Sequence, residues 1–226
     1  MLDRLFTQFD HIIILDVETT GLQHKTDEII EFGGLCLHAD GSSYKIDEEL
    51  NMLIRLSGSR QLTPFITDLT GITQKALDTQ GLDKKTACAK LVHLLDVSRP
   101  LVVAYNAQFD LCFLYYFLHQ FSEAGRLKKI KMLDALTIYR DRQDYPHKLA
   151  NAIEVYKLKT QNTHRAIDDA KAAFELLIAM DQEAPDLERY INLFGFNAKY
   201  GISGPRIASI TYKPQGFTHE HKLYEA

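Results

Sequence analysis

A continuous run of four branched aliphatic residues, Ile12 to Leu15, is the feature that most constrains the fold of this chain. Residues of a strand point alternately to its two faces, so an unbroken apolar run is typical of a strand covered on both faces. The run is followed directly by Asp16 and Glu18, which share one face of the same strand. The sequence therefore predicts a central strand whose carboxyl end carries two neighbouring carboxylates.

The remaining pattern predicts strands first and helices later. Strands are expected at residues 28–37, 44–55 and 101–104, with a turn at Asp40-Gly41 between the first two. Apolar residues at helical spacing predict helices at residues 84–95, 111–121, 149–156 and 166–180, and residues 131–138 suit a short strand followed by the start of a helix. This order indicates an α/β fold in which helices flank a mixed sheet.

The character of the chain changes after Met180. We expect residues 1–182 to form the main domain and residues 183–226 to form a C-terminal extension of unknown role. The extension offers four aromatic residues as candidate docking anchors: Phe194, Phe196, Tyr200 and Tyr212. The net charge of −4 gives no global basic field of the kind that favours nucleic acid.

The three cysteines are unclustered and stand in apolar surroundings, which favours small buried side chains over a disulfide or zinc framework. They are Cys36, Cys88 and Cys112. The first residues show no signal-peptide pattern, and the Ile12 to Leu15 run is much too short to span a bilayer. We therefore expect a cytoplasmic protein without a membrane partner.

The pair Asp16 and Glu18 is a candidate metal site. Open α/β sheets commonly bind ligands at the carboxyl ends of their strands, where both carboxylates project. Two like charges side by side are costly unless a cation lies between them. A solvated strand end is nevertheless the simpler explanation of such a short motif when it is taken alone.

A second acid, Asp110, follows the strand expected at residues 101–104 and opens an apolar helix. A carboxylate at the start of a helix accepts backbone N–H groups, so an N-cap is the simpler role for Asp110. Capping and metal binding are compatible roles for one carboxylate.

His164 and one of two adjacent aspartates form a third candidate group. At about 100° per residue, helical geometry places Asp169 at the edge of the apolar stripe of residues 166–180 and Asp168 nearly opposite. Asp169 is therefore expected to face the protein, where a carboxylate needs a partner such as a metal ion. His164 precedes this helix and lies within reach of the same place, although alone it would be interpreted as a surface histidine.

The three groups together resemble the motifs of the DnaQ-like DEDDh exonuclease superfamily, which includes the proofreading subunits and domains of bacterial replicative polymerases. The matching motifs are residues 14–22 (ILDVETTGL), 106–110 (NAQFD) and 164–169 (HRAIDD). The family places its last acid five residues after the histidine, which selects Asp169. Residues 64–72 (PFITDLTGI) and Asp134 agree more weakly, and Tyr105 departs from the histidine that often precedes the asparagine. The resemblance covers about residues 9–180.

The resemblance implies a ribonuclease H-like fold with a mixed five-stranded sheet flanked by helices, and a 3′-5′ exonuclease that hydrolyses phosphodiester bonds. It implies two divalent cations, Mg²⁺ or Mn²⁺, held by Asp16, Glu18, Asp110 and Asp169. Hard cations prefer oxygen ligands, and two of them can clamp the attacking and leaving oxygens of an in-line displacement. His164 is the expected general base, because imidazole accepts a proton near neutral pH.

Substrate contacts follow from the same resemblance. Thr19, Gly21 and Leu22 are implied to hold the terminal nucleotide, and Asn106 and Phe109 are implied to line its pocket. Stacking on apolar or aromatic side chains tolerates any base, which suits an exonuclease without sequence preference. Core packing explains Phe109 equally well.

The expected substrate is a nucleic-acid 3′ end, DNA rather than RNA, from which nucleoside monophosphates are released during replication proofreading or repair. An RNA-trimming exoribonuclease of the same superfamily is the first alternative, since the motifs are shared. A non-catalytic module that recruits a polymerase is a weaker alternative, because all five catalytic positions are filled. A DNA polymerase or another replication protein is a candidate partner. A basic cluster also offers phosphate contacts, although a solvated loop explains it more simply: Arg126, Lys128, Lys129 and Lys131.

Overall fold

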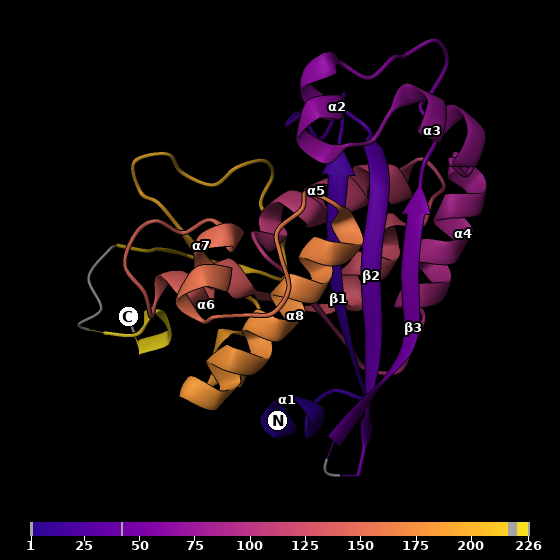
Figure 1. The fold of residues 1–226 in the computed structure, drawn as a ribbon. Coiled ribbons are helices and arrows are strands. Elements are labelled where there is room, and N and C mark those ends of the chain that lie inside the picture. The colour runs from indigo at the N-terminus through magenta and orange to yellow at the C-terminus, as the bar shows by residue number, and fades with distance from the viewer. Residues whose placement is uncertain (1, 42, 217–220, 226) are drawn as a thin grey trace.

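A five-stranded mixed sheet forms the centre of the structure. The computed structural model describes residues 2–41, 43–216 and 221–225 and is drawn in Figure 1. Its strands are β1 (His11–Thr19), β2 (Ile29–Asp40), β3 (Ser43–Leu53), β4 (Pro100–Ala104) and β5 (Lys131–Asp134). They lie in the order β3-β2-β1-β4-β5, with β1 antiparallel to β2 and parallel to β4. The predicted mixed sheet is confirmed, and its central strand is β1.

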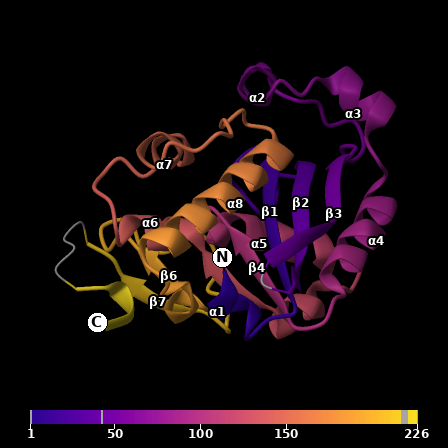
Figure 2. The same ribbon diagram turned by 60° about the horizontal axis from the view of Figure 1, so that its bottom comes forward.

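Helices cover both faces of the sheet (Figure 2). The first face carries α4 (Lys84–Leu95) and α5 (Ala107–His119). The second face carries α1 (Asp3–Phe6), α6 (Ala135–Arg140), α7 (Leu149–Val155) and α8 (Ala166–Glu183). Alternate residues of β1 face the two layers, because Ile13 and Leu15 pack with α4 and α5 whereas Ile12 and Ile14 pack with α8. This alternation decides which face receives the side chains that follow.

The structure corrects the sequence prediction at the start of α5. The helix begins at Ala107 rather than Leu111, so Asp110 lies inside its first turn and the suggested N-cap role for Asp110 is wrong. The N-cap is Asn106, in the left-handed conformation (φ 68°) that asparagine tolerates better than most residues. The carboxylate of Asp134 accepts the N–H groups of Asn106 and Ala107 at 2.9 and 3.0 Å. A residue from β5 therefore fixes this helix start, which local sequence does not reveal.

The sequence prediction does not include α1, nor the short helices α2 (Pro64–Thr70) and α3 (Gln74–Gln80). Helices α2 and α3 have N-caps, since the hydroxyl oxygens of Thr63 and Thr73 accept N–H groups from the first turn of their helices. Gly71 ends α2 with a φ of 70°. These helices bury only one or two residues each, so the apolar periodicity that reveals longer helices is missing.

The C-terminal extension packs onto the sheet domain. It contains η2 (Leu187–Tyr190), β6 (Leu193–Phe196), β7 (Thr211–Pro214) and η3 (Leu223–Glu225), and β6 and β7 pair in parallel. Asn192 joins the two parts, because its side-chain oxygen accepts the Met132 N–H at 2.9 Å and its own N–H donates to the Met132 carbonyl at 2.7 Å. Phe194 is buried in the core beside α5, whereas Tyr200 is 77% exposed. Phe194 is therefore not free to anchor a partner.

The three cysteines are free and buried, as predicted. Across the described ranges, no helix has both the length and the apolar character needed to cross a membrane.

Candidate active site

The carboxyl end of β1 presents two carboxylates to the layer that contains α8. Asp16 and Glu18 have the same parity along the strand as Ile12 and Ile14, so their side chains share the α8 face. Both are half-buried. On the neighbouring strand β2, Asp16 lies opposite Gly33, and Glu18 lies opposite Glu31. The central strand therefore delivers the two acids to the sheet face on which α8 begins.

Gly33 allows α8 to approach this end of the sheet closely. A Cβ atom at position 33 would lie only 2.2 Å from the backbone nitrogen of Ile167 and 2.3 Å from the carbonyl carbon of Ala166. No side chain fits in that space, so a glycine is required for this approach. Because Gly33 is the cross-strand neighbour of Asp16, the contact brings the first turn of α8 next to the carboxylates of β1.

The first turn of α8 and the loop before it contribute Asp169 and His164. One ligand atom each of Glu18, His164 and Asp169 lie within 4.8 Å of one another. Asp169 is buried, whereas Asp168 is half-exposed, which is the arrangement that helical periodicity predicts. The Asp169 carboxylate accepts hydrogen bonds from the Asn162 side-chain amide at 2.8 Å and from the Thr163 N–H at 3.2 Å.

Asp110 reaches the site from α5. It is buried, and its Oδ1 accepts the backbone N–H of Val17 at 3.1 Å, between the two acids of β1. The hydrogen bonds from Asn106 and Ala107 to Asp134 hold the start of α5 that carries Asp110. The four predicted acids therefore come from β1, α5 and α8, and three segments far apart in the sequence meet at one end of the sheet.

The carboxylates perturb one another electrostatically. Burial, followed by the charge of Asp169, raises the pKa of Glu18 to about 8. Burial also raises the pKa of Asp169 to about 6. The pKa values of Asp16 and Asp110 are both raised by burial, and the charges of Asp110, Glu18 and Asp169 raise that of Asp16 further. Without a cation, this group of acids binds protons instead.

The donor set fits divalent cations. Glu18, Asp169 and His164 bring ligand atoms close together, and no cysteine takes part. Asp16 and Asp110 lie near enough for their charges to act within this group. Oxygen ligands of this kind suit hard cations such as Mg²⁺ or Mn²⁺, and a bound cation would remove the repulsion that raises these pKa values.

The predicted substrate-binding residues differ in their contacts and in their exposure to solvent. The Thr19 hydroxyl donates to the Gly21 carbonyl at 2.6 Å, which closes the turn after β1. Leu22 follows on this turn and is 78% exposed. Asn106 is exposed, and half-buried Phe109 packs against Phe113 with ring centroids 4.8 Å apart. Phe109 therefore combines core packing with partial access to solvent.

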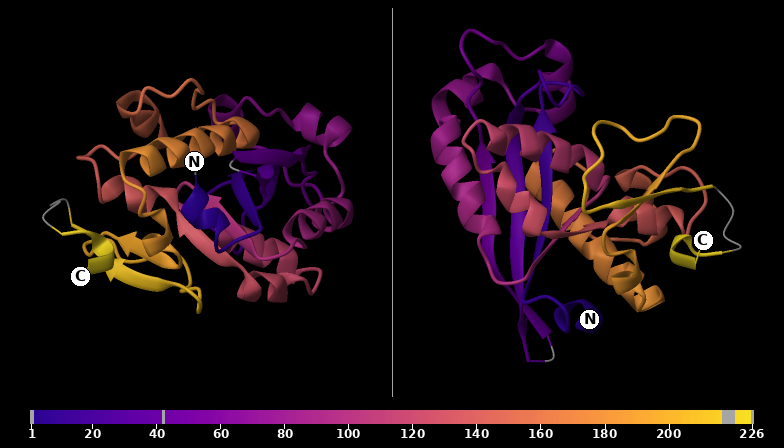
Figure 3. Two further views of the ribbon diagram at one scale, coloured as in Figure 1. Left: turned by 90° about the horizontal axis from the view of Figure 1, so that it is seen from below. Right: turned by 180° about the vertical axis from the view of Figure 1, so that it is seen from behind.

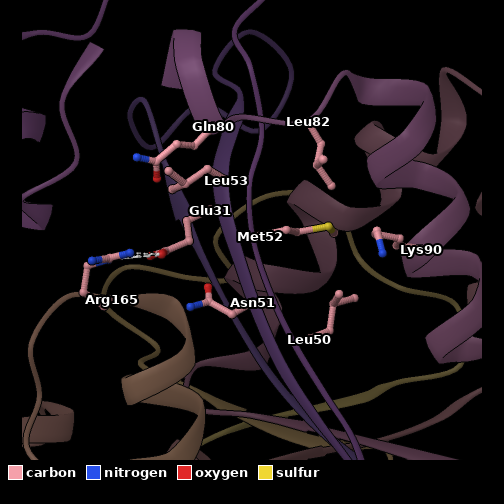
Figure 4. Close-up of a pocket in the computed structure, with 9 residues that line it drawn as sticks. All are labelled: Glu31, Leu50, Asn51, Met52, Leu53, Gln80, Leu82, Lys90 and Arg165. Carbon is pink, nitrogen blue, oxygen red and sulfur yellow. Dashed lines mark hydrogen bonds and ion pairs between the residues drawn. The ribbon is translucent and has the colours of Figure 1, made fainter. Parts of the chain in front are cut away.

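Sequence reasoning did not identify an ion pair that fixes the start of α8. Glu31 has no exposed surface, and its carboxylate accepts hydrogen bonds from Arg165 Nε at 3.0 Å and Nη2 at 2.5 Å (Figure 4). It also accepts the Ala166 N–H at 2.9 Å. His164 thus stands between two anchored neighbours, Thr163 and Arg165, with a left-handed φ of 54°. An acid in a strand that is otherwise apolar was the available signal for Glu31.

The predicted basic cluster does not act as one group. Arg126 is engaged by Asp96 at 3.0 Å and by Glu123 at 2.6 Å. Lys128, Lys129 and Lys131 are exposed.

Fold and site together define a class: α/β proteins with a ribonuclease H-like sheet and a carboxylate cluster suited to divalent cations at the end of the central strand. A family model described as "Exonuclease" (RNase_T) matches residues 13–177. The chain belongs to this exonuclease family, and the similarities below place it in the DnaQ-like superfamily of 3′-5′ exonucleases.

Relatives of known name are much longer than this chain. It is 30% identical to a PolC-type DNA polymerase III of Caldanaerobacter subterraneus subsp. tengcongensis, over 77% of this chain and 12% of that protein. It is 29% identical to the 3′-5′ exonuclease DinG of Staphylococcus haemolyticus, over 77% of this chain and 18% of that protein. Escherichia coli ExoI, solved as a zinc-bound complex with ssDNA, shares the fold with a TM-score of 0.71 and 17% identity, covering 81% of this chain and 43% of that one. The chain thus spans a small part of its curated relatives.

Proposed function

We propose that this chain is a metal-dependent exonuclease that removes nucleoside monophosphates from the 3′ end of DNA, in replication proofreading or repair. One observation carries the proposal: Glu18, His164 and Asp169 approach within 4.8 Å, beside Asp16, whose pKa is raised by burial and by the surrounding acids. Such a group is unfavourable in an isolated fold and becomes favourable when cations bind. The name of the PolC-type relatives, DNA polymerase III, supports DNA as the substrate.

Each acid has a structural reason to serve as a ligand. Asp16 and Glu18 project from the rigid central strand, Asp110 is fixed through the Val17 N–H, and Asp169 is fixed through Asn162 and Thr163. Two divalent cations, Mg²⁺ or Mn²⁺, would neutralise the phosphate and the developing charge on the attacking and leaving oxygens. The protein contributes the fixed positions of its oxygen ligands, which avoids reorganisation during the reaction.

His164 acts as the general base in this proposal. The residue is exposed on the loop before α8, and its ring reaches the cluster of Glu18 and Asp169. An imidazole nitrogen there can accept the proton that the attacking water loses. The anchored neighbours of His164 hold the ring near this position without packing against it.

Leu22, with Thr19 and Gly21 in the same turn, contacts the terminal nucleotide in this proposal. The exposed leucine beside the acids offers an apolar surface for a base, and Phe109 and Asn106 border the same region from α5. Contacts of this kind recognise the flat face of a base and not its identity.

The test uses matched 5′-labelled DNA and RNA strands with Mg²⁺, Mn²⁺ or EDTA. We expect a ladder that shortens from the 3′ end of DNA with either cation and disappears with EDTA. Asp16→Asn should abolish hydrolysis, and His164→Ala should lower kcat by about 100-fold or more while Mg²⁺ binding persists.

Asp168→Asn is the matched control, since this aspartate adjoins Asp169 but is half-exposed and bonded to the Thr163 hydroxyl at 2.7 Å. It should retain most of the activity. If only the RNA strand is shortened, the substrate is RNA and not DNA. If Asp16→Asn retains the wild-type rate, the assigned site is refuted.

A further inference from the structure

A cavity of about 650 Å³ lies beside α5, on the side of the C-terminal extension. It is enclosed by α5, by η1 (Ala124–Lys129) and by residues 205–209. Leu111, Leu127 and Met132 provide much of its apolar lining. We call it the α5 cavity. Leu111 directly follows Asp110 on α5, so one helix carries both a proposed metal ligand and part of the cavity lining.

The extension is held in place over α5 by Gln108. Its side-chain nitrogen donates to the carbonyl oxygens of Ser203 at 2.9 Å and Pro205 at 2.8 Å, and its side-chain oxygen accepts the Tyr212 hydroxyl at 2.7 Å. The loop between β6 and β7 consequently runs alongside α5, as the view from behind in Figure 3 shows. Gln108 lies two residues before Asp110, so the wall of the cavity is tied to the proposed catalytic segment.

The charged side chains that line the cavity are both cations. Lys128 and Arg206 line it, and no carboxylate among the described residues does. In the described part of the chain neither residue has an ion-pair partner, although the Arg206 guanidinium lies 5.4 Å from the centre of the Tyr212 ring. The Ser209 hydroxyl, which also belongs to this lining, is buried without a hydrogen-bond partner among those residues. An anionic ligand with hydrogen-bonding groups complements this set.

Aromatic rings connect the cavity with the proposed active site. Tyr115 and Tyr116 line the cavity, and Tyr115 is 40% exposed. The Tyr116 ring stacks on His24 at 5.1 Å, and His24 meets the edge of Phe113, which packs against Phe109. This row of rings begins at Phe109, next to Asp110 in the sequence, and continues along α5 to Tyr116.

We propose that the α5 cavity binds one nucleotide of the single-stranded substrate, upstream of the terminal nucleotide that is cleaved. The base stacks on Tyr115, and its phosphates meet Lys128 and Arg206. This inference rests on the proposed exonuclease function and adds a second binding position to it. The C-terminal extension then has a role in holding the strand, because Arg206 and Ser209 come from it.

The spacing suits a short single strand. Tyr116 lies six residues beyond Asp110 on α5, about 9 Å along the helix axis at 1.5 Å per residue. A stacked strand rises about 3.4 Å per nucleotide, so the cavity lies roughly two to three nucleotides from the cleaved end. A duplex end would have to separate before its strand could reach this position.

The test measures equilibrium binding by fluorescence anisotropy in the Asp16→Asn background, so that cleavage does not interfere. The ligands are 5′-labelled DNA strands of ten nucleotides and of two nucleotides. We expect Tyr115→Ala to weaken binding of the longer strand about tenfold and to leave the dinucleotide unchanged. Lys128→Ala with Arg206→Ala should lower the slope of log K against log salt concentration by about 1.4, because each phosphate contact on a single strand contributes about 0.7.

Two controls remove similar groups outside the cavity: Lys85→Ala, an exposed lysine of α4, and Tyr145→Ala, a ring that is 76% exposed. Neither should change binding of the longer strand. Unchanged binding in Tyr115→Ala, or equal losses with both strand lengths, would overturn the proposal and leave the cavity to a protein segment.

Hydrolysis of a p-nitrophenyl ester of thymidine monophosphate reports on the catalytic centre alone. If the wild-type protein does not hydrolyse this ester but Tyr115→Ala still weakens binding of the longer strand alone, the catalytic function is rejected and the cavity remains a nucleic-acid site.

Discussion

The ion pair between Glu31 and Arg165 leads to a prediction of unequal effects from its two partners. Glu31 has no exposed side-chain surface, whereas the Arg165 side chain is 41% exposed. Removal of the arginine leaves a buried carboxylate without a counter-charge, and removal of the carboxylate leaves a cation that water can reach. Arg165→Met should therefore destabilise the fold more than Glu31→Gln.

The magnitudes follow from the contacts. Breaking a buried pair costs about 3–5 kcal/mol, which is the range expected for Arg165→Met near neutral pH. For Glu31→Gln we expect about 2 kcal/mol, since Arg165 stays solvated while the Ala166 N–H keeps only a neutral acceptor. The double variant should resemble Glu31→Gln alone, because it contains no unpaired buried charge.

Lys171→Met is the matched control. Lys171 also joins α8 to the sheet, through Glu49 at 2.8 Å, but both side chains are exposed. Its loss should cost less than about 1 kcal/mol.

Urea unfolding followed by circular dichroism measures all four variants. Equal costs for Arg165→Met and Lys171→Met would refute this reasoning. A second readout is kcat, which should fall in Arg165→Met because His164 loses one of its two anchored neighbours.

Three further predictions concern the same end of the sheet. The pKa values of Glu18 and Asp169, raised to about 8 and about 6, exceed those of an unfolded chain. The contribution of these two groups to stability in EDTA should therefore be fully present below about pH 4 and be lost as the pH rises toward 8. Thermal unfolding should show this decline, with Mg²⁺ reversing it; a flat profile in EDTA would contradict the assigned burial. Gly33→Ala should cost about 1–3 kcal/mol in urea unfolding and reduce hydrolysis, because its Cβ would lie 2.2 Å from the backbone of α8. Gly125→Ala is the control and should behave like wild type, because no atom lies within 4 Å of its Cβ position. Gln108→Ala should speed tryptic cleavage within the C-terminal extension, and an unchanged digestion pattern would show that other contacts hold that loop.

The sequence by itself determined the features that depend on local periodicity. An unbroken apolar run identified the central strand, and strand alternation placed Asp16 and Glu18 on one face. Helical periodicity distinguished Asp169 from Asp168, because residues of one helix keep a fixed angular relation wherever the helix packs. The mixed sheet and most of the longer helices follow from the same kind of information.

Tertiary structure decided how closely those residues meet. The 4.8 Å cluster of Glu18, His164 and Asp169 depends on the backbone contact at Gly33 and on the buried Glu31 and Arg165 pair. The place of Asp110 depends on Asp134, which holds the start of α5 so that Asp110 lies inside its first turn. None of these contacts joins neighbours in sequence, so no local pattern encodes them. The course of the C-terminal extension is of the same kind, because Gln108 binds carbonyl groups about 95 residues further along the chain. Periodicity sets the direction of each side chain, whereas the packing of distant backbones sets the distances on which binding and chemistry depend.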